Sequence, residues 1–176
     1  MPDSYEEDAC ELLDADHLAV KHLFVEYARL AYAAAAPAGT YAAPPPDEDV
    51  DDAKDNRATI ATTICDELTV HAQIEEEIFY PALRQAVPAA ADVLDEAKQE
   101  HAQAKALIAQ IRQLSTADPT MDSLMAELAR AIEDHVKEER DELFPKARAA
   151  AGLDLAELGA RLKQRQQALA EQPGKP

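Results

Sequence analysis

The sequence predicts an all-α protein, an up-down four-helix bundle with an additional C-terminal helix. Three observations predict this fold. The composition is 47% apolar with only four glycines in 176 residues, and its abundant alanine favours helix over strand. Apolar residues recur at the three- and four-residue spacing of helices through most of the chain. A pattern of two helices also occurs twice, which is typical of a bundle built from two hairpins.

The first predicted hairpin begins with a helix over residues 5–36. Its apolar residues at helical spacing are Leu13, Val20, Phe24, Tyr27 and Ala31. Residues 37–46 contain three consecutive prolines, which cannot continue a helix, so we expect a loop there. The second helix begins between residues 47 and 55, and it ends or kinks at Pro81.

The second predicted hairpin follows Pro88, a residue suited to the first turn of a helix over 89–114. Asp118 and Pro119 are a capping residue and a first-turn proline, and they predict a fourth helix that breaks near Pro145. A capping box of Asp154 and Glu157 predicts a fifth helix over 155–170. We therefore divide the chain into a bundle, 1–150, and a C-terminal helix with a disordered tail, 151–176.

Charge and composition restrict the function. A net charge of −18 argues against nucleic acid and anionic membrane surfaces as partners, because like charges repel. The chain has no run of eighteen apolar residues, and its acidic start does not resemble a secretion signal, so we expect a cytoplasmic protein. We also expect a monomer. Cys10 and Cys65 form no Cys-x-x-Cys motif and are expected to be buried thiols.

The strongest motif is His71-x-x-x-Glu75, which recurs as His135-x-x-x-Glu139. Each copy is followed by an aromatic residue and a proline. Residues four apart lie on one face of a helix, so each copy directs an imidazole and a carboxylate to the same place. A single such pair is commonly only a contact on a helix surface. Its repetition with the same ending indicates a shared site.

The other two helices of the bundle contain a second repeat. Asp16-His17-x-x-x-Lys21 in the first hairpin matches Glu100-His101-x-x-x-Lys105 in the second. His22 lies well away from His17 around the helix and is expected at the surface. Two equivalent hairpins would bring six side chains together in the bundle: His17, His71, Glu75, His101, His135 and Glu139.

Six buried titratable groups are costly unless a partner satisfies them, and a metal does so. Imidazole and carboxylate ligands differ from the sulfur-rich set of structural zinc, and six ligands exceed what one catalytic zinc needs. Two metal ions bridged by Glu75 and Glu139, with two histidines on each, would use every ligand. Iron is the usual occupant of such bundle sites, and manganese is the alternative.

Residues around the motifs have alternative predicted roles. Glu67 lies one turn before His71 and is either an extra ligand, a hydrogen-bond partner of the site or a solvated residue. Lys21 and Lys105 either meet the carboxylates or an anionic ligand, or extend outward. The remaining acidic residues of the motifs, Glu76, Glu77, Glu138 and Asp141, are expected on a solvated face.

The order His17, His71-x-x-x-Glu75, His101, His135-x-x-x-Glu139, with Phe144-Pro145, resembles the hemerythrin-like, or HHE cation-binding, family across residues 9–150. The resemblance implies two iron ions joined by an oxo or hydroxo bridge in an up-down bundle. It also implies that dioxygen, nitric oxide or peroxide binds at an open iron position.

This sequence departs from the oxygen-carrying members of that family. Those proteins have a second histidine four residues from the one on the third helix, and an aspartate as last ligand. Here Ala97 and Lys105 flank His101, and the last ligand is Glu139. The departure argues against oxygen transport and favours reaction with peroxide or nitric oxide in redox defence, with an electron donor that the sequence does not indicate. The alternative is an iron- or oxygen-sensing or iron-binding module without turnover.

Overall fold

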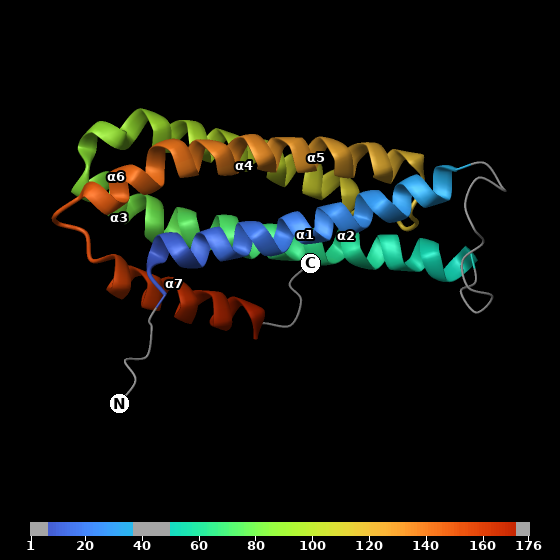
Figure 1. The fold of residues 1–176 in the computed structure, drawn as a ribbon, viewed down its shortest axis with the longest axis horizontal. Coiled ribbons are helices and arrows are strands. Elements are labelled where there is room, and N and C mark those ends of the chain that lie inside the picture. Colours follow the sequence, from blue (N-terminus) through green and yellow to red (C-terminus); the bar gives the residue numbers. More distant parts are fainter. Residues whose placement is uncertain (1–6, 37–49, 172–176) are drawn as a thin grey trace.

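The computed structural model describes residues 7–36 and, with side chains from Asn56 onward, 50–171. Its helices run antiparallel along one long axis (Figure 1). The elements, in chain order, are α1 (Ala9–Ala35), α2 (Val50–Ile74), the π-helical η1 (Glu75–Phe79), α3 (Tyr80–Ala86), the 3-10 turn η2 (Pro88–Ala90), α4 (Ala91–Ile111), α5 (Pro119–Glu138), the π-helical η3 (Glu139–Leu143), α6 (Phe144–Ala149) and α7 (Leu155–Ala170).

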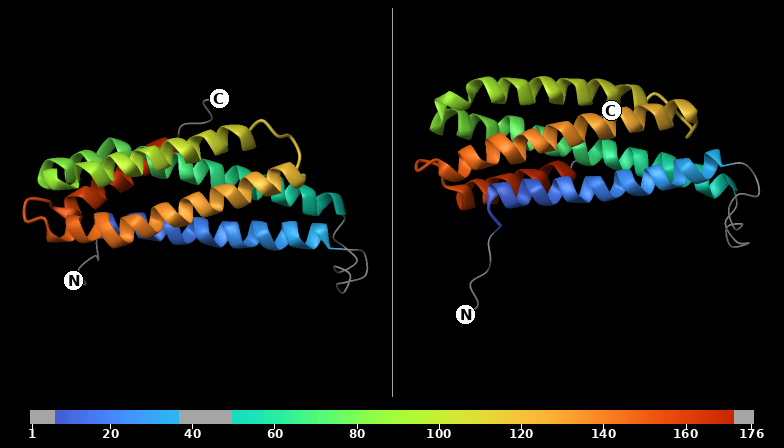
Figure 2. Two further views of the ribbon diagram at one scale, coloured as in Figure 1. Left: turned by 90° about the horizontal axis from the view of Figure 1, so that it is seen from above. Right: turned by 45° about the horizontal axis from the view of Figure 1, so that its top comes forward.

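The predicted fold class is confirmed. Helices α1 and α2 form one hairpin and α4 and α5 the other, and contacts of α1 with α5 and of α2 with α4 close the bundle. Helix α7 packs outside the bundle along α1, α2 and η1 (Figures 1 and 2). None of the helices among the described residues is both long enough and apolar enough to span a membrane.

Capping residues set the helix starts. The side chain of Asp118 accepts a hydrogen bond from the Met121 backbone, and that of Asp154 accepts one from Glu157, as the sequence predicts. Helix α1 starts at residue 9 rather than at the predicted residue 5, because Asp8 and Glu11 form a reciprocal capping box there. The predicted loop 37–46 lies outside the described residues, as does 172–176 of the predicted tail.

The expected breaks at Pro81 and Pro145 are replaced by π-helical turns. The backbone N–H of Tyr80 donates to the carbonyl of Glu75, and that of Phe144 donates to Glu139. Each bond spans five residues instead of four. A widened turn accommodates a proline, which has no N–H and would clash with the preceding turn of an α-helix. Both helices therefore continue past their prolines, and both wide turns begin at a predicted ligand.

A layer of polar residues divides the hydrophobic core. One apolar cluster contains Leu13, Phe79, Leu94 and Phe144 among its buried side chains. The other contains Ile64, Leu68, Met125 and Leu128, which lie on the other side of the site histidines along the bundle helices. The four site histidines lie between the two clusters in sequence on every helix of the bundle. The candidate site thus crosses the middle of the bundle.

Helix α7 lies close to the start of α1 at Gly159. A Cβ atom at this position would lie 2.6 Å from the carbonyl oxygen of Glu7 and 2.9 Å from the backbone nitrogen of Ala9. Both neighbours are backbone atoms at the start of α1, so they cannot move aside as a flexible side chain would. The missing side chain of Gly159 therefore permits this contact between the helices.

We predict that Gly159→Ala destabilises the fold although alanine is the better helix former. Overpacking against backbone atoms costs roughly 1–3 kcal/mol. Because neither backbone neighbour can move aside, we expect a cost near the upper end of this range, which exceeds the gain of about 1 kcal/mol in helix propensity. Thermal unfolding followed by circular dichroism should show a lower midpoint. Gly152→Ala is the matched control, since no atom lies within 4 Å of its added Cβ. Equal midpoints for the two variants would contradict the prediction.

Candidate metal centre

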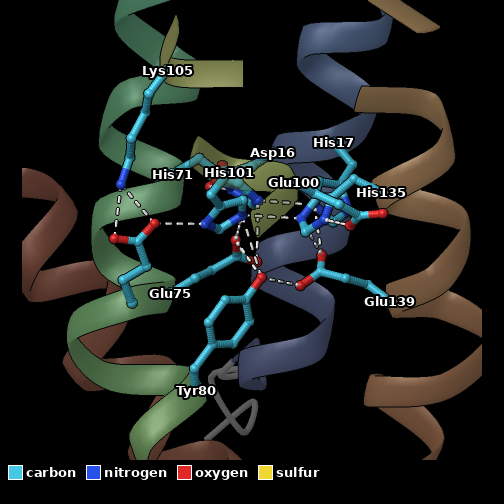
Figure 3. A network of polar contacts seen from close by, with 11 residues as sticks. Asp16, His17, His71, Glu75, Tyr80, Glu100, His101, Lys105, His135 and Glu139 are labelled. Carbon is cyan, nitrogen blue, oxygen red and sulfur yellow. Dashed lines mark hydrogen bonds and ion pairs between the residues drawn. The ribbon is translucent and has the colours of Figure 1, made fainter. Parts of the chain in front are cut away.

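The structure brings all six predicted site residues together in the middle of the bundle (Figure 3). Each helix of the bundle contributes one histidine, and the four rings are 3% to 6% exposed. The carboxylates of Glu75 and Glu139 are fully buried. Each carboxylate lies four residues after a histidine, at the first residue of a π-helical turn.

The four histidines form two pairs, one within each hairpin. The Nε2 atoms of His17 and His71 are 2.9 Å apart, and those of His101 and His135 are 3.1 Å apart. Two imidazole nitrogens at this distance cannot both carry a proton. Either one donates to the other, or both lone pairs face a shared cation.

The two carboxylates lie between the pairs. Glu75 spans them, because its Oε1 is 3.2 Å from Nε2 of His71 and its Oε2 is 3.2 Å from Nε2 of His101. Glu139 lies closer to the first pair, with its Oε2 at 3.2 Å from Nε2 of His17 and 3.7 Å from Nε2 of His135. The geometry therefore suits Glu75 as a bridging group and Glu139 mainly as a ligand beside His17.

The donor atoms of the site fit a metal better than they fit one another. Glu75 Oε1 and Glu139 Oε2 are buried and accept no hydrogen bond, although imidazole nitrogens lie within ion-pair distance. The groups His17, His71, Glu75, Glu139 and Glu75, His101, His135 each offer ligand atoms within 4.8 Å of one another. Ligand atoms about 2.1 Å from one octahedral metal ion lie at most about 4.2 Å apart. The ligand atoms of each group are therefore spaced almost as they would be around one ion, and the two groups correspond to two metal positions.

Carboxylates on the outer side of the rings hold three of the histidines. Asp16 Oδ2 lies 3.3 Å from Nδ1 of His71, and Glu100 Oε2 lies 2.7 Å from Nδ1 of His135. Each acidic residue directly precedes a site histidine and contacts the histidine of the other helix in its hairpin. The sequence repeat contained this signal, because Asp16 and Glu100 occupy equivalent positions. These contacts fix the ring orientation and leave Nε2 facing the centre.

The expectation that Glu76 belongs to a solvated face is wrong. Its Oε1 lies 2.9 Å from Nδ1 of His101, and both of its oxygens accept hydrogen bonds from Lys105 Nζ, at 2.6 and 2.8 Å. The equivalent position in the second repeat is Arg140, which donates to Asp14 instead. Asp14 lies 3.8 Å from Nδ1 of His17, and that nitrogen has no hydrogen bond. The two halves of the site therefore differ.

Tyr80 is a site residue that the sequence pattern did not predict. Its hydroxyl donates to Glu139 Oε1 at 2.9 Å and lies 3.4 Å from Glu75 Oε2 and 3.3 Å from Nε2 of His101. Burial and the two carboxylates raise the pKa of Tyr80 well above its usual value, so the phenol is a neutral donor. The equivalent residue, Phe144, has no hydroxyl and stacks against His17. Tyr80 lies at the His101 side, where the sequence predicted one ligand fewer.

Charge within the site follows from its burial. Burial alone would raise the pKa of Glu75, but His71 and His101 hold it well below its usual value, so the carboxylate is ionised. Burial opposes a charge on His135 as well, yet Glu139 and the hydrogen bond to Glu100 raise its pKa to about 9. The pKa of His71 is also raised well above its usual value, by Glu75 and Asp16. The carboxylates thus favour cations at the ring nitrogens, whether protons or metal ions.

Several neighbouring residues lie outside the site. Of the three alternatives for Glu67, the structure supports the solvated residue and not the extra ligand or hydrogen-bond partner, because this side chain is exposed on α2. One turn of α2 separates Glu67 from His71, and the drift of a helix around its axis moves it away from Glu75. His22 is exposed, as expected. Lys21 is exposed as well, which agrees with the alternative that it extends outward. Cys10 and Cys65 are buried, free thiols, and burial raises their pKa to about 12 and 11.

A small pocket adjoins the histidine side of the site. The four histidines form its polar part. Its apolar walls come from α2, α4 and α5, including Ala72, Ala104 and Ile108. Lys105 lines the same pocket and is about half exposed. The pocket suits a small, uncharged molecule, because the small alanine side chains leave the space beside the imidazoles and the walls offer no charge except Lys105.

Histidines and carboxylates gathered in the centre of an antiparallel helical bundle define a class of metal-binding bundle proteins. The sequence profile of the hemerythrin HHE cation-binding domain matches residues 8–147. The chain therefore belongs to the hemerythrin HHE cation-binding family, and its clustered histidines and glutamates are able to hold metal.

Two further comparisons place the chain among known proteins. The crystal structure of a hemerythrin HHE cation-binding domain-containing protein from Mycobacterium kansasii has a TM-score of 0.65 at 22% identity, over 92% of this chain and 86% of that chain. At this identity the likeness shows the fold. A DNA nickase from a Nostoc species is 35% identical over 78 residues, which are 44% of this chain and 22% of that protein. The chain therefore spans less than a quarter of that relative.

Proposed function

We propose that this protein binds two iron ions and reacts with small ligands such as peroxide or nitric oxide. The observation that carries the proposal is the pair of buried carboxylates between two facing histidine pairs, with Glu75 Oε1 and Glu139 Oε2 accepting no hydrogen bond. Iron is favoured because imidazole and carboxylate ligands in a helical bundle are typical of di-iron proteins, and manganese is the alternative.

Each metal position would use its own histidines. His17 and His71, with Glu139, would hold one ion, and His101 and His135 would hold the other, with Glu75 between them. The iron pair would supply one-electron redox chemistry and an open position for a ligand. The carboxylates of Asp16, Glu76 and Glu100 orient three of the imidazoles.

One feature of the chain favours peroxide or nitric oxide over reversible oxygen carriage. Ala97 and Lys105 lie four residues before and after His101. The alanine side chain has no nitrogen, and Nζ of Lys105 donates to Glu76, so neither residue adds a nitrogen ligand. The pocket beside the imidazoles has room for a small ligand of any of these kinds. Tyr80 donates to Glu139 on the opposite side of the carboxylates, which keeps that oxygen in place.

Purified protein provides the test. Elemental analysis should find about two iron ions per chain, and the near-ultraviolet absorption of the iron centre should change when peroxide or nitric oxide is added. Protein that is free of iron after expression with ample iron would overturn the proposal. A spectrum that does not respond to either ligand would overturn the reactivity and favour an iron-binding or sensing module without turnover.

We predict that Ala104→Leu slows the reaction with peroxide or nitric oxide without changing the iron content. Ala104 is 6% exposed and lines the pocket, so a larger side chain fills the space beside the imidazoles. A tenfold slower reaction, which corresponds to about 1.4 kcal/mol, is the expected size, measured by stopped-flow absorption. Ala106→Leu is the matched control, because Ala106 is exposed on the same helix. Equal rates in both variants would exclude this pocket as the entry route.

A further inference from the structure

Helix α7 reaches the candidate metal centre through the side chain of Gln166. Its Nε2 donates a hydrogen bond of 2.9 Å to Asp16 Oδ2. The same oxygen lies 3.3 Å from Nδ1 of His71. Three elements are therefore connected in series: Gln166 on α7, Asp16 on α1 and the site histidine on α2. Gln166 lies outside residues 8–147, the part of the chain that matches the family profile.

The carboxylates beside the site histidines are anchored in different ways. Lys105 pairs with Glu76, and Arg140 pairs with Asp14, so a cationic side chain partly neutralises the negative charge of each of these carboxylates. Asp16 is held by the neutral amide of Gln166. A neutral donor fixes the orientation of the carboxylate and leaves its negative charge for the imidazole of His71.

The first histidine pair depends more on this connection than the second pair depends on α7. His101 and His135 are held at Nδ1 by Glu76 and Glu100, both from the bundle, at 2.9 and 2.7 Å. In the first pair, Nδ1 of His17 has no hydrogen bond, so Asp16 is the carboxylate that orients a ring there. The main contacts of α7 within the described chain are with α1, α2 and η1, which contribute to this half of the site.

We propose that Gln166 is a positioning residue for the metal position formed by His17 and His71, so that α7 slows the release of metal from that position. The inference rests on the proposed two-metal centre. With Asp16 held in place, Nδ1–H of His71 donates to the carboxylate, which leaves the Nε2 lone pair directed at the metal. Because coupling between two binding events is reciprocal, metal at this position also stabilises the docking of α7.

Other contacts keep α7 docked when Gln166 is changed. Leu158 and Leu162 are buried in the core, and Arg165 pairs with Glu77 at 2.7 Å. Gln166→Ala should therefore remove the contact to Asp16 without detaching the helix. Arg165→Ala removes a partly exposed ion pair at the adjacent residue, while the buried Leu158 and Leu162 keep α7 docked and Asp16 keeps its contact, so it is the matched control. Gln167→Ala, at an exposed position, controls for the substitution itself.

The experiment loads the full chain with Co²⁺ and follows its release to a chelator. We expect two phases, of which the one from the His17 and His71 position is about tenfold faster in Gln166→Ala, while the other phase is unchanged. The visible absorption of the bound Co²⁺ should also shift in Gln166→Ala, because the orientation of one imidazole changes. Arg165→Ala and Gln167→Ala should keep the spectrum and both rates of the original protein.

The outcomes separate this inference from the proposed function. Equal release rates in Gln166→Ala and Arg165→Ala, or equal acceleration of both phases, would overturn the positioning role. Original protein that retains no Co²⁺ would overturn both the inference and the metal centre. The expected release pattern in a protein that does not respond to peroxide or nitric oxide would support the positioning role and overturn only the proposed reactivity.

Discussion

Glu75→Gln is expected to release metal from both positions at once. The two oxygens of Glu75 face different histidine pairs, at 3.2 Å from Nε2 of His71 and of His101. A glutamine offers one neutral oxygen and one NH₂ group, so one pair loses its ligand and faces the NH₂ group, while the other pair loses the negative charge that attracts the cation. The side chain is fully buried, so water cannot replace the lost ligand. Elemental analysis should show a fall from about two ions per chain to well below one.

Glu67→Gln is the control for this experiment. It makes the same chemical change on the same helix, at an exposed residue two turns before Glu75. This variant should keep both ions. If Glu75→Gln also kept both, the assignment of Glu75 as the shared ligand would be wrong. If Glu67→Gln lost metal, the exclusion of Glu67 from the site would be wrong.

Metal-free protein is expected to lose stability as the pH rises from about 6.5 to about 9. Although burial opposes its charge, Glu139 and Glu100 raise the pKa of His135 to about 9, and that of His71 is raised as well. A raised pKa means that the folded state holds the proton more tightly. This stabilisation is complete below the unfolded value of about 6.5 and disappears as the pH passes the folded value. His135 alone accounts for about 3 kcal/mol.

Urea unfolding with a chelator present, at pH 6, 7, 8 and 9, would measure this loss. The metal-loaded protein should show the opposite trend, because metal and proton compete for Nε2 and binding tightens as the protons leave. His22→Gln is the control and should keep the slope, since His22 is exposed. Stability of the metal-free protein that stays constant or rises over this range would contradict the prediction.

The sequence was sufficient for the fold class and for the six residues that the structure gathers. Both follow from repeated spacing: a helix places residues four apart on one face, and two equivalent hairpins place their faces opposite each other. Capping residues such as Asp118 and Asp154 act within one turn, so they also predicted where helices begin.

Features that depend on packing between helices could not be predicted in the same way. Proline at position 81 indicated a break, but the fold keeps the helix and widens one turn, because the residues beyond it are buried in the core. Tyr80 looked like part of the apolar ending of the motif, and only the position of Glu139 on another helix gives its hydroxyl a partner. Glu76 and Glu67 are both acidic residues beside the motif, and only helix α4 distinguishes them, because His101 and Lys105 face Glu76.

The polar layer in the middle of the bundle has a consequence for folding cooperativity. The apolar clusters on its two sides contain different residues, and the groups that connect them across the layer are histidines and carboxylates that favour water when no cation holds them. Without metal, the two clusters are coupled less strongly, and the unfolding transition would be less cooperative. With metal, ligands from all four helices share one centre, and the two ends of the protein would unfold as one unit.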